Sequence, residues 1–189
     1  MSEGCGKIVD IVFWVNIFCG VKMKAHLLYL KYVLRHKWFV FLACLDYRIV
    51  WLGVIHDWSR FRPSEWIPYA ASAPYTKGNK PAAIANAFEQ AWNDHQHRNK
   101  HHWEYWVHFD YHTHEMRVLP IPDKYRHEMI ADWIGAGRAK GITSTWEWYE
   151  ANKDKMQLHP DTRVWVEHEL TLLKQRNRTE RMFKAGFFG

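Results

Sequence analysis

The chain has 189 residues, hydrophobic residues make up 48% of it, and its formal net charge is +6. The hydrophobic content excludes a disordered chain, and the length is sufficient for one globular domain with its own core. The three cysteines form no CxxC pair, which excludes a cysteine-rich zinc site and indicates a reducing, cytoplasmic setting.

The 13 histidines, together with carboxylates, are therefore the candidates for metal binding. The modest basic charge suits an anionic ligand such as a nucleotide, and it equally suits weak nucleic-acid binding. Much of the basic excess lies near the C-terminus, where residues 177–189 are interpreted as a basic tail. The net charge therefore does not locate a site.

The chain begins with an apolar run at residues 8–21, which Asp10 and Asn16 interrupt. The run is short of the roughly 20 apolar residues that a membrane span needs, and it lacks a signal-peptide pattern. We therefore expect no membrane partner. The run is interpreted as a strand, a docked helix, or an extension ahead of a second possible start at Met23. Residues 1–22 are assigned as an N-terminal extension.

A single helical domain is expected over residues 23–176. Apolar residues recur at spacings of three, four and seven from Lys24 to about Asp46, which predicts a long helix with His36 on its apolar side. A second helical segment, residues 50–55, is entirely apolar and leads into the dipeptide His56-Asp57.

Burying an ionised carboxylate costs several kcal/mol unless a partner or a metal compensates its charge. His56 and Asp57 are thus either metal ligands, or a core histidine beside a helix cap or an arginine partner. Pro63 is expected to open the next helix, because proline is favoured in a first helical turn.

The second half of the chain carries further candidates. The helix expected at residues 81–99 places His95 on its apolar side, and His101 and His102 follow a break at Asn99. Residues 104–119 are less helical and suggest a short hairpin. A helix at residues 122–140 carries Asp132 in its middle, and two more helices are expected at 146–156 and 162–175.

Polar residues on inward faces therefore recur in a fixed order, as a histidine, a His-Asp dipeptide and a distant aspartate. Over residues 24–140 this order resembles the HD-domain superfamily of metal-dependent phosphohydrolases, which implies an all-α, compact helical bundle. The resemblance implies four core metal ligands, His36, His56, Asp57 and Asp132. Members with two metals insert two further histidines, which match His95 and either His102 or His101.

The resemblance also implies a reaction. One or two divalent ions (Mn, Fe, Co, Zn or Mg) would activate water for the hydrolysis of a nucleotide or a related phosphomonoester. Asp57 would bridge two metals or orient the attacking hydroxide, and Arg60 would neutralise the phosphate. The superfamily often has Gly-Lys where this chain has Ser59-Arg60. Glu65 is either a general acid or base, or a carboxylate that favours a helix N-terminus.

A second resemblance covers the whole chain. A small family of phage and bacterial proteins shares four stretches and implies no activity: 35–38, the His56-Asp57 dipeptide, 95–99 and 131–135. Two alternatives to a phosphohydrolase remain open. The same ligand set suits an HD-type di-iron oxygenase, and the basic tail with exposed aromatics suits a non-enzymatic module that binds nucleic acid or protein.

Overall fold

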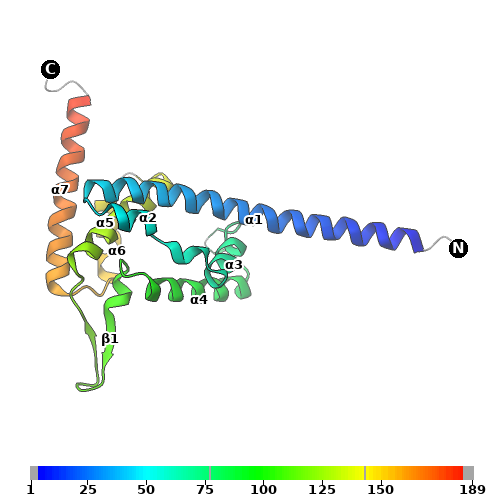
Figure 1. The fold of residues 1–189 in the computed structure, drawn as a ribbon, viewed down its shortest axis with the longest axis horizontal. Helices are drawn as coiled ribbons and strands as arrows, with labels where there is room; N and C mark the ends of the chain where they lie inside the picture. The colour runs from blue at the N-terminus through cyan, green and yellow to red at the C-terminus, as the bar shows by residue number, and fades with distance from the viewer. Residues whose placement is uncertain (1–3, 77, 143, 185–189) are drawn as a thin grey trace. The chain divides into compact units, whose positions relative to one another are not determined.

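A computed structural model describes residues 4–76, 78–142 and 144–184, with side-chain surroundings from residue 23 to residue 179 (Figure 1). The described residues are mainly helical, and their strands form one short hairpin, which confirms the predicted all-α fold. Helices and strands follow in the order α1 (Gly4–Asp46), α2 (Val50–Ile55), α3 (Pro63–Ser72), α4 (Ala82–Arg98), β1 (Val107–Asp110), β2 (Glu115–Val118), α5 (Asp123–Lys140), α6 (Thr145–Asn152) and α7 (Pro160–Lys184).

Short 3-10 helices lie at Trp58–Phe61, Trp103–Trp106 and Lys153–Lys155. The chain forms two compact units. The first contains the residues up to Leu34 and Ser59–His95, and the second contains Arg35–Trp58 and the residues from Gln96 onward. Helix α1 contributes to both units.

Aromatic residues fill the core of the first unit. Tyr29 and Val33 of α1 are buried in one cluster with Tyr69 of α3 and Ala91 of α4. The ring centroids of Tyr29 and Tyr69 lie 5.6 Å apart. Pro63 stands at the start of α3, as the sequence predicted, because its fixed φ suits a first helical turn.

The second unit has its largest core where α5, α6 and α7 meet. Met129 and Ile130 of α5, Tyr149 of α6 and Val166 of α7 are fully buried there. A smaller cluster joins the last turns of α1 to α5 through Val40 and neighbouring residues. These contacts fix the part of α5 that carries Asp132.

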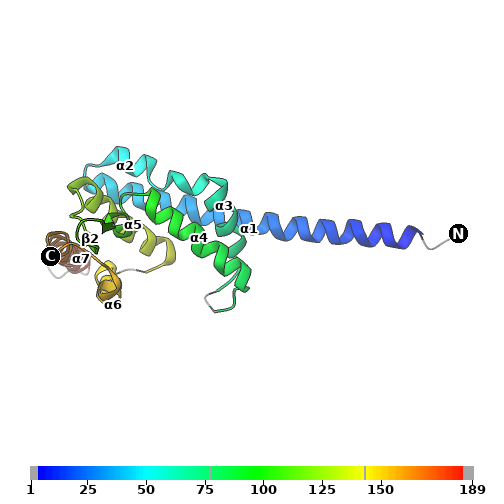
Figure 2. The same ribbon diagram turned by 90° about the horizontal axis from the view of Figure 1, so that it is seen from below.

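The hairpin lies between α4 and α5 in the chain, and β2 is visible in Figure 2. Its antiparallel register pairs Val107 with Val118 and Asp110 with Glu115. Asp110 also accepts a charged hydrogen bond from Arg117 at 2.8 Å. The hairpin predicted over residues 104–119 is therefore confirmed.

Two helices are longer than the sequence pattern predicted. Residues 8–21, for which a strand was one alternative, lie within α1, whereas the side chains of residues 1–22 are outside the described set. Helix α7 continues past Gln175 to Lys184, because this stretch contains neither glycine nor proline. Within the part of the chain that the structure describes, no helix has both the length and the hydropathy for crossing a bilayer.

Candidate metal centre

His36 and the His56-Asp57 dipeptide are brought together by the N-terminal part of the second unit. His36 lies between Val33 and Val40 on the buried side of α1, and only 1% of its surface is exposed. Helix α2 ends at Ile55, and His56 leaves the helical conformation with φ −48° and ψ 132°. The chain therefore turns at the dipeptide and directs it toward α1.

Asp57 has an unusual backbone conformation. Its φ is +53°, in the left-handed region, which a residue other than glycine adopts at a cost. Aspartate tolerates this region better than most residues, because its short polar side chain bonds locally. Both His56 and Asp57 are 1% exposed. The turn thus buries a carboxylate in a strained conformation beside a histidine.

Helix α5 supplies two carboxylates to the same place. Glu128 and Asp132 are four residues apart, so they project from one face of the helix. The close approach of α5 to α1 depends on Gly135, because a Cβ at this position would lie 2.3 Å from Cγ2 of Val40. His101, from the segment after α4, is the remaining buried residue of the cluster.

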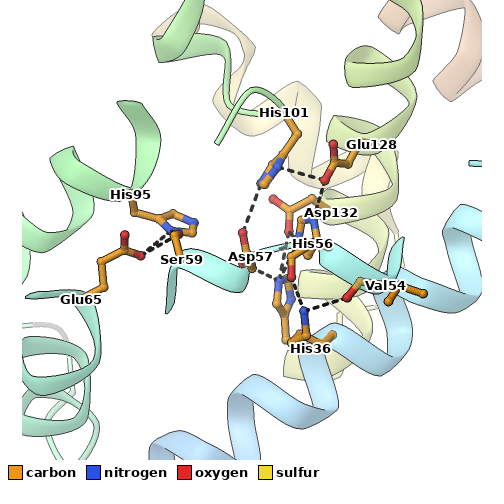
Figure 3. A network of polar contacts seen from close by, with 11 residues as sticks. His36, Val54, His56, Asp57, Ser59, Glu65, His95, His101, Glu128 and Asp132 are labelled. Carbon is orange, nitrogen blue, oxygen red and sulfur yellow. Dashed lines mark hydrogen bonds and ion pairs between the residues drawn. The ribbon is translucent and has the colours of Figure 1, made fainter. Parts of the chain in front are cut away.

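Four ligand atoms converge at the centre of this cluster (Figure 3). Nε2 of His36 lies 3.2 Å from Oδ2 of Asp57 and 3.2 Å from Oδ1 of Asp132. Nε2 of His56 lies 3.5 Å from the same atom of Asp57 and 3.4 Å from the same atom of Asp132. The two Nε2 atoms are 3.3 Å apart.

These five distances fit a shared cation. Ligand atoms at about 2.0–2.2 Å from a tetrahedral cation lie about 3.3–3.6 Å from one another. Two imidazole nitrogens and two carboxylate oxygens form a ligand set typical of zinc and other first-row divalent ions. The residues present therefore fit a bound divalent metal, and the buried cluster could hold one.

Further carboxylate and imidazole contacts surround the four ligand atoms. Nδ1 of His56 donates to Oε1 of Glu128 at 3.0 Å. Nδ1 of His101 lies 3.4 Å from the same oxygen, and its Nε2 lies 3.4 Å from Oδ1 of Asp57. A hydrogen bond from the distal nitrogen to a carboxylate is the usual way in which a metal-binding histidine is oriented. Glu128 is therefore placed to orient His56.

The same geometry shifts the pKa values of the cluster. Burial alone would lower the pKa of His56, but the negative charge of Asp57 and hydrogen bonds to Asp132 and Glu128 raise it to about 10. Burial would raise the pKa of Asp132, yet hydrogen bonds from His36 and His56 hold it well below its usual range. Without a cation, His56 therefore holds a proton more tightly than a free imidazole, whereas the carboxyl of Asp132 holds one less tightly than usual.

Lys37 contacts the backbone at the end of α2. Its Nζ donates to the carbonyl oxygen of His56 and, at 3.5 Å, to that of Val54. The ammonium group also lies 6.0 Å from the ring centroid of Trp58. A cation at the C-terminal carbonyls of a helix is favourable, and here it also holds the turn that carries the ligands.

The structure brings together all four residues that the HD resemblance gave as core ligands. His102 also belongs to this unit, and it offers a nitrogen within 4.8 Å of ligand atoms of Asp57 and His101. The sequence left His101 and His102 as alternatives, and both lie near Asp57. Glu128 was missed, although its spacing of four residues from Asp132 on one helix face was a readable signal.

The other three candidates, Arg60, Glu65 and His95, lie in the first unit. Nδ1 of His95 donates to Oε2 of Glu65 at 2.8 Å, and both side chains are fully buried (Figure 3). Ser59 donates to the same carboxylate at 3.0 Å. Arg60 is buried, with its guanidinium carbon 5.3 Å from the ring centroid of Tyr69. The roles expected of these residues in phosphate contact, acid–base catalysis and metal binding stay predictions.

The fold and the cluster define an all-α protein with a buried histidine–carboxylate group that could bind a metal. The chain belongs to DUF5662, a family of unknown function, whose pattern matches residues 25–172. No curated protein and no solved structure matches the chain.

Proposed function

We propose that His36, His56, Asp57 and Asp132 bind a divalent metal, and that the protein is a metal-dependent phosphohydrolase acting on a nucleotide or a related phosphomonoester. The observation that carries this proposal is the convergence of two imidazole Nε2 atoms and two carboxylate oxygens at 3.2–3.5 Å. The order of these residues along the chain, which resembles that of the HD-domain superfamily, supports hydrolysis as the reaction.

The alternative explanation of the cluster is a metal-free one, in which protonated histidines neutralise the buried carboxylates. Two imidazolium rings with their Nε2 atoms 3.3 Å apart would repel each other strongly, because both side chains are buried. A single divalent ion compensates both carboxylates and uses the lone pairs of both rings. The ligand set is therefore better explained by a metal than by two extra protons.

The bound metal would lower the pKa of a coordinated water and polarise a phosphoryl oxygen. The chain's own residues would keep the site ordered and handle protons. Glu128 holds the Nδ1 proton of His56, which leaves Nε2 as a ligand. His101, with Nε2 3.4 Å from Oδ1 of Asp57, is the candidate to accept or return a proton during hydrolysis.

Elemental analysis of untagged protein tests the metal site directly. We expect a divalent metal in the purified protein, and its loss in His56→Ala and Asp132→Ala. The matched controls are His108→Ala and Asp154→Ala, because both side chains are exposed and lie outside the cluster. Wild-type protein that binds no metal after reconstitution would overturn the proposal, as would full metal content in His56→Ala.

A panel of nucleotides and phosphomonoesters, assayed with the metals found, then tests the reaction. Release of inorganic phosphate should require metal and should disappear in Asp57→Asn. Iron with a characteristic optical spectrum and no phosphatase activity would instead favour the di-iron oxygenase. A protein that takes up only zinc, manganese or cobalt would exclude that oxygenase.

A further inference from the structure

Helix α2 exposes its apolar side chains and buries its glycine. Trp51, Val54 and Ile55 share one side of the helix and are 71%, 47% and 39% exposed. On the opposite side Gly53 lies so close to α1 that a Cβ would be 2.8 Å from Cβ of Cys44. Surface helices usually turn their apolar side toward the core. Helix α2 instead exposes most of its apolar side chains to solvent.

Neighbouring residues of the same unit extend this surface. We define the α2 face as the exposed apolar side chains of Trp38, Val50, Trp51, Val54, Ile55 and Trp58. Lys37 of α1 contacts two residues of this face, since its ammonium group donates to the carbonyl of Val54 and lies over the ring of Trp58. Both ribbon views show α2 beside the C-terminal end of α1 (Figures 1 and 2). An exposed apolar patch of this kind marks an interaction surface.

Cations lie at the α2 face or close to it in the chain. Lys37 is half-buried with its ammonium group over the ring of Trp58, Arg48 is exposed two residues before α2, and Arg35 is exposed on α1 three residues before Trp38. The exposed acid of this stretch, Asp46, has its carboxylate 3.8 Å from a guanidinium nitrogen of Arg176. The exposed charges that accompany the α2 face are therefore mainly positive, and the partner that suits it combines an apolar surface with negative charge.

We propose that the α2 face binds the surface of an anionic lipid bilayer. Tryptophan favours the boundary between headgroups and acyl chains, and three of the six residues of the face are tryptophans. A short apolar helix bordered by cations is suited to lie in the plane of this boundary. The sequence-based expectation of no membrane partner considered only a spanning segment, and surface binding needs none.

A second copy of the chain is a poorer partner for this face. A symmetric dimer uses the same patch on both subunits, so Arg35, Lys37 and Arg48 of each copy would share one interface. Their repulsion would oppose association, whereas anionic headgroups would be attracted. This inference does not depend on the proposed function, because none of the six residues is a metal ligand.

Vesicle co-sedimentation of the full chain tests the inference. Vesicles of phosphatidylcholine alone and of phosphatidylcholine with phosphatidylglycerol are compared. We expect binding to the anionic vesicles, weakened by salt, with a blue shift of tryptophan fluorescence. The affinity of the double variant Val50→Ser/Trp51→Ser for anionic vesicles should fall by about tenfold or more. The matched control is Tyr111→Ser, which removes an aromatic side chain that is 81% exposed in the hairpin region.

A second variant separates binding from folding. Arg48→Glu reverses one exposed charge without changing the apolar residues, and it should weaken binding to anionic vesicles. The inference would be overturned if the wild-type protein did not bind vesicles or bound both vesicle types equally. It would also be overturned if both variants bound as tightly as the wild-type protein. A wild-type dimer in analytical ultracentrifugation that becomes monomeric in Val50→Ser/Trp51→Ser would also overturn it, because the face would then join two copies.

Discussion

The Nε2 atoms of His36 and His56 face each other at 3.3 Å, although the residues come from α1 and from the turn after α2. Oxygens of Asp57 and Asp132 lie within 3.5 Å of both nitrogens. A proton or a metal ion must occupy this position to reduce the repulsion among the four groups. We therefore expect a bound metal, as proposed, to compete with protons at this site.

The pH dependence of stability should differ between the metal-free and metal-loaded protein. The pKa of His56 is raised from 6.5 to about 10, so its protonation stabilises the metal-free fold fully below pH 6.5. This stabilisation is lost as the pH rises through 10. The pKa of Asp132 is lowered from 3.8, so its stabilisation is present above pH 3.8 and is lost on acidification. Metal binding displaces protons and should therefore strengthen with rising pH.

Urea unfolding measures both effects. In chelator, the free energy of unfolding should fall between pH 6.5 and pH 10, whereas the stabilisation by added metal should grow over this range. His108→Ala serves as a control, since this exposed histidine should leave the profile unchanged. A metal-free profile that is flat or rises across this range would contradict the prediction.

Glu128→Gln tests how His56 is oriented. The substitution preserves the size of the side chain but removes the charge that holds the Nδ1 proton of His56. We expect a roughly 10–100-fold loss of metal affinity with the four ligands intact. Chelator competition measures the affinity, and Glu150→Gln, on the partly exposed side of α6, is the control. Equal affinities for the two variants would exclude an orienting role.

Lys37→Met tests the contact between Lys37 and the end of α2. The variant keeps an apolar stem and loses the ammonium group that donates to the carbonyls of Val54 and His56. We expect about tenfold weaker metal binding, by analogy with other residues that hold ligands in place. Lys37→Arg should recover part of the affinity, and Lys24→Met should have none of the effect. Failure of Lys37→Arg to exceed Lys37→Met would argue against positioning by charge.

Substitutions of Asp57 separate backbone strain from ligand chemistry. Asparagine tolerates a φ of +53° and alanine does not, so Asp57→Ala should be less stable than Asp57→Asn by roughly 1–2 kcal/mol. Both variants should lose the metal, because neither retains a carboxylate. Thermal unfolding in chelator and elemental analysis provide the two measurements. Metal retained by Asp57→Asn would show that this carboxylate is not a ligand.

Gly135→Ala tests the approach of α5 to α1. The new Cβ would lie 2.3 Å from Cγ2 of Val40 and 2.7 Å from its backbone nitrogen, so one helix must move. We expect a loss of roughly 1–3 kcal/mol in stability and weaker metal binding through Asp132. Gly137→Ala, on the same helix, would place its Cβ 3.3 Å from the carbonyl of Ile142 and should have a smaller effect. Chemical denaturation compares the two.

The sequence was informative wherever a local pattern sets the direction of a side chain. The 3.6-residue period of apolar residues placed His36 and Asp132 on inward helix faces, and both belong to the group that could hold a metal. The hairpin followed from short apolar segments separated by polar residues. Helix ends were less predictable, because the apolar period fades after Gln175 although no glycine or proline ends the helix there.

The sequence by itself determined the all-α fold, the order of the histidines and aspartates, and the buried faces on which His36 and Asp132 lie. Only the tertiary structure decided that Glu128 supports His56, that Asp57 adopts a positive φ, and that α2 turns its tryptophan outward. The reason is physical. Periodicity fixes where a side chain points from its own helix, whereas the distance between ligand atoms depends on how closely helices pack, as at Gly135 and Gly53.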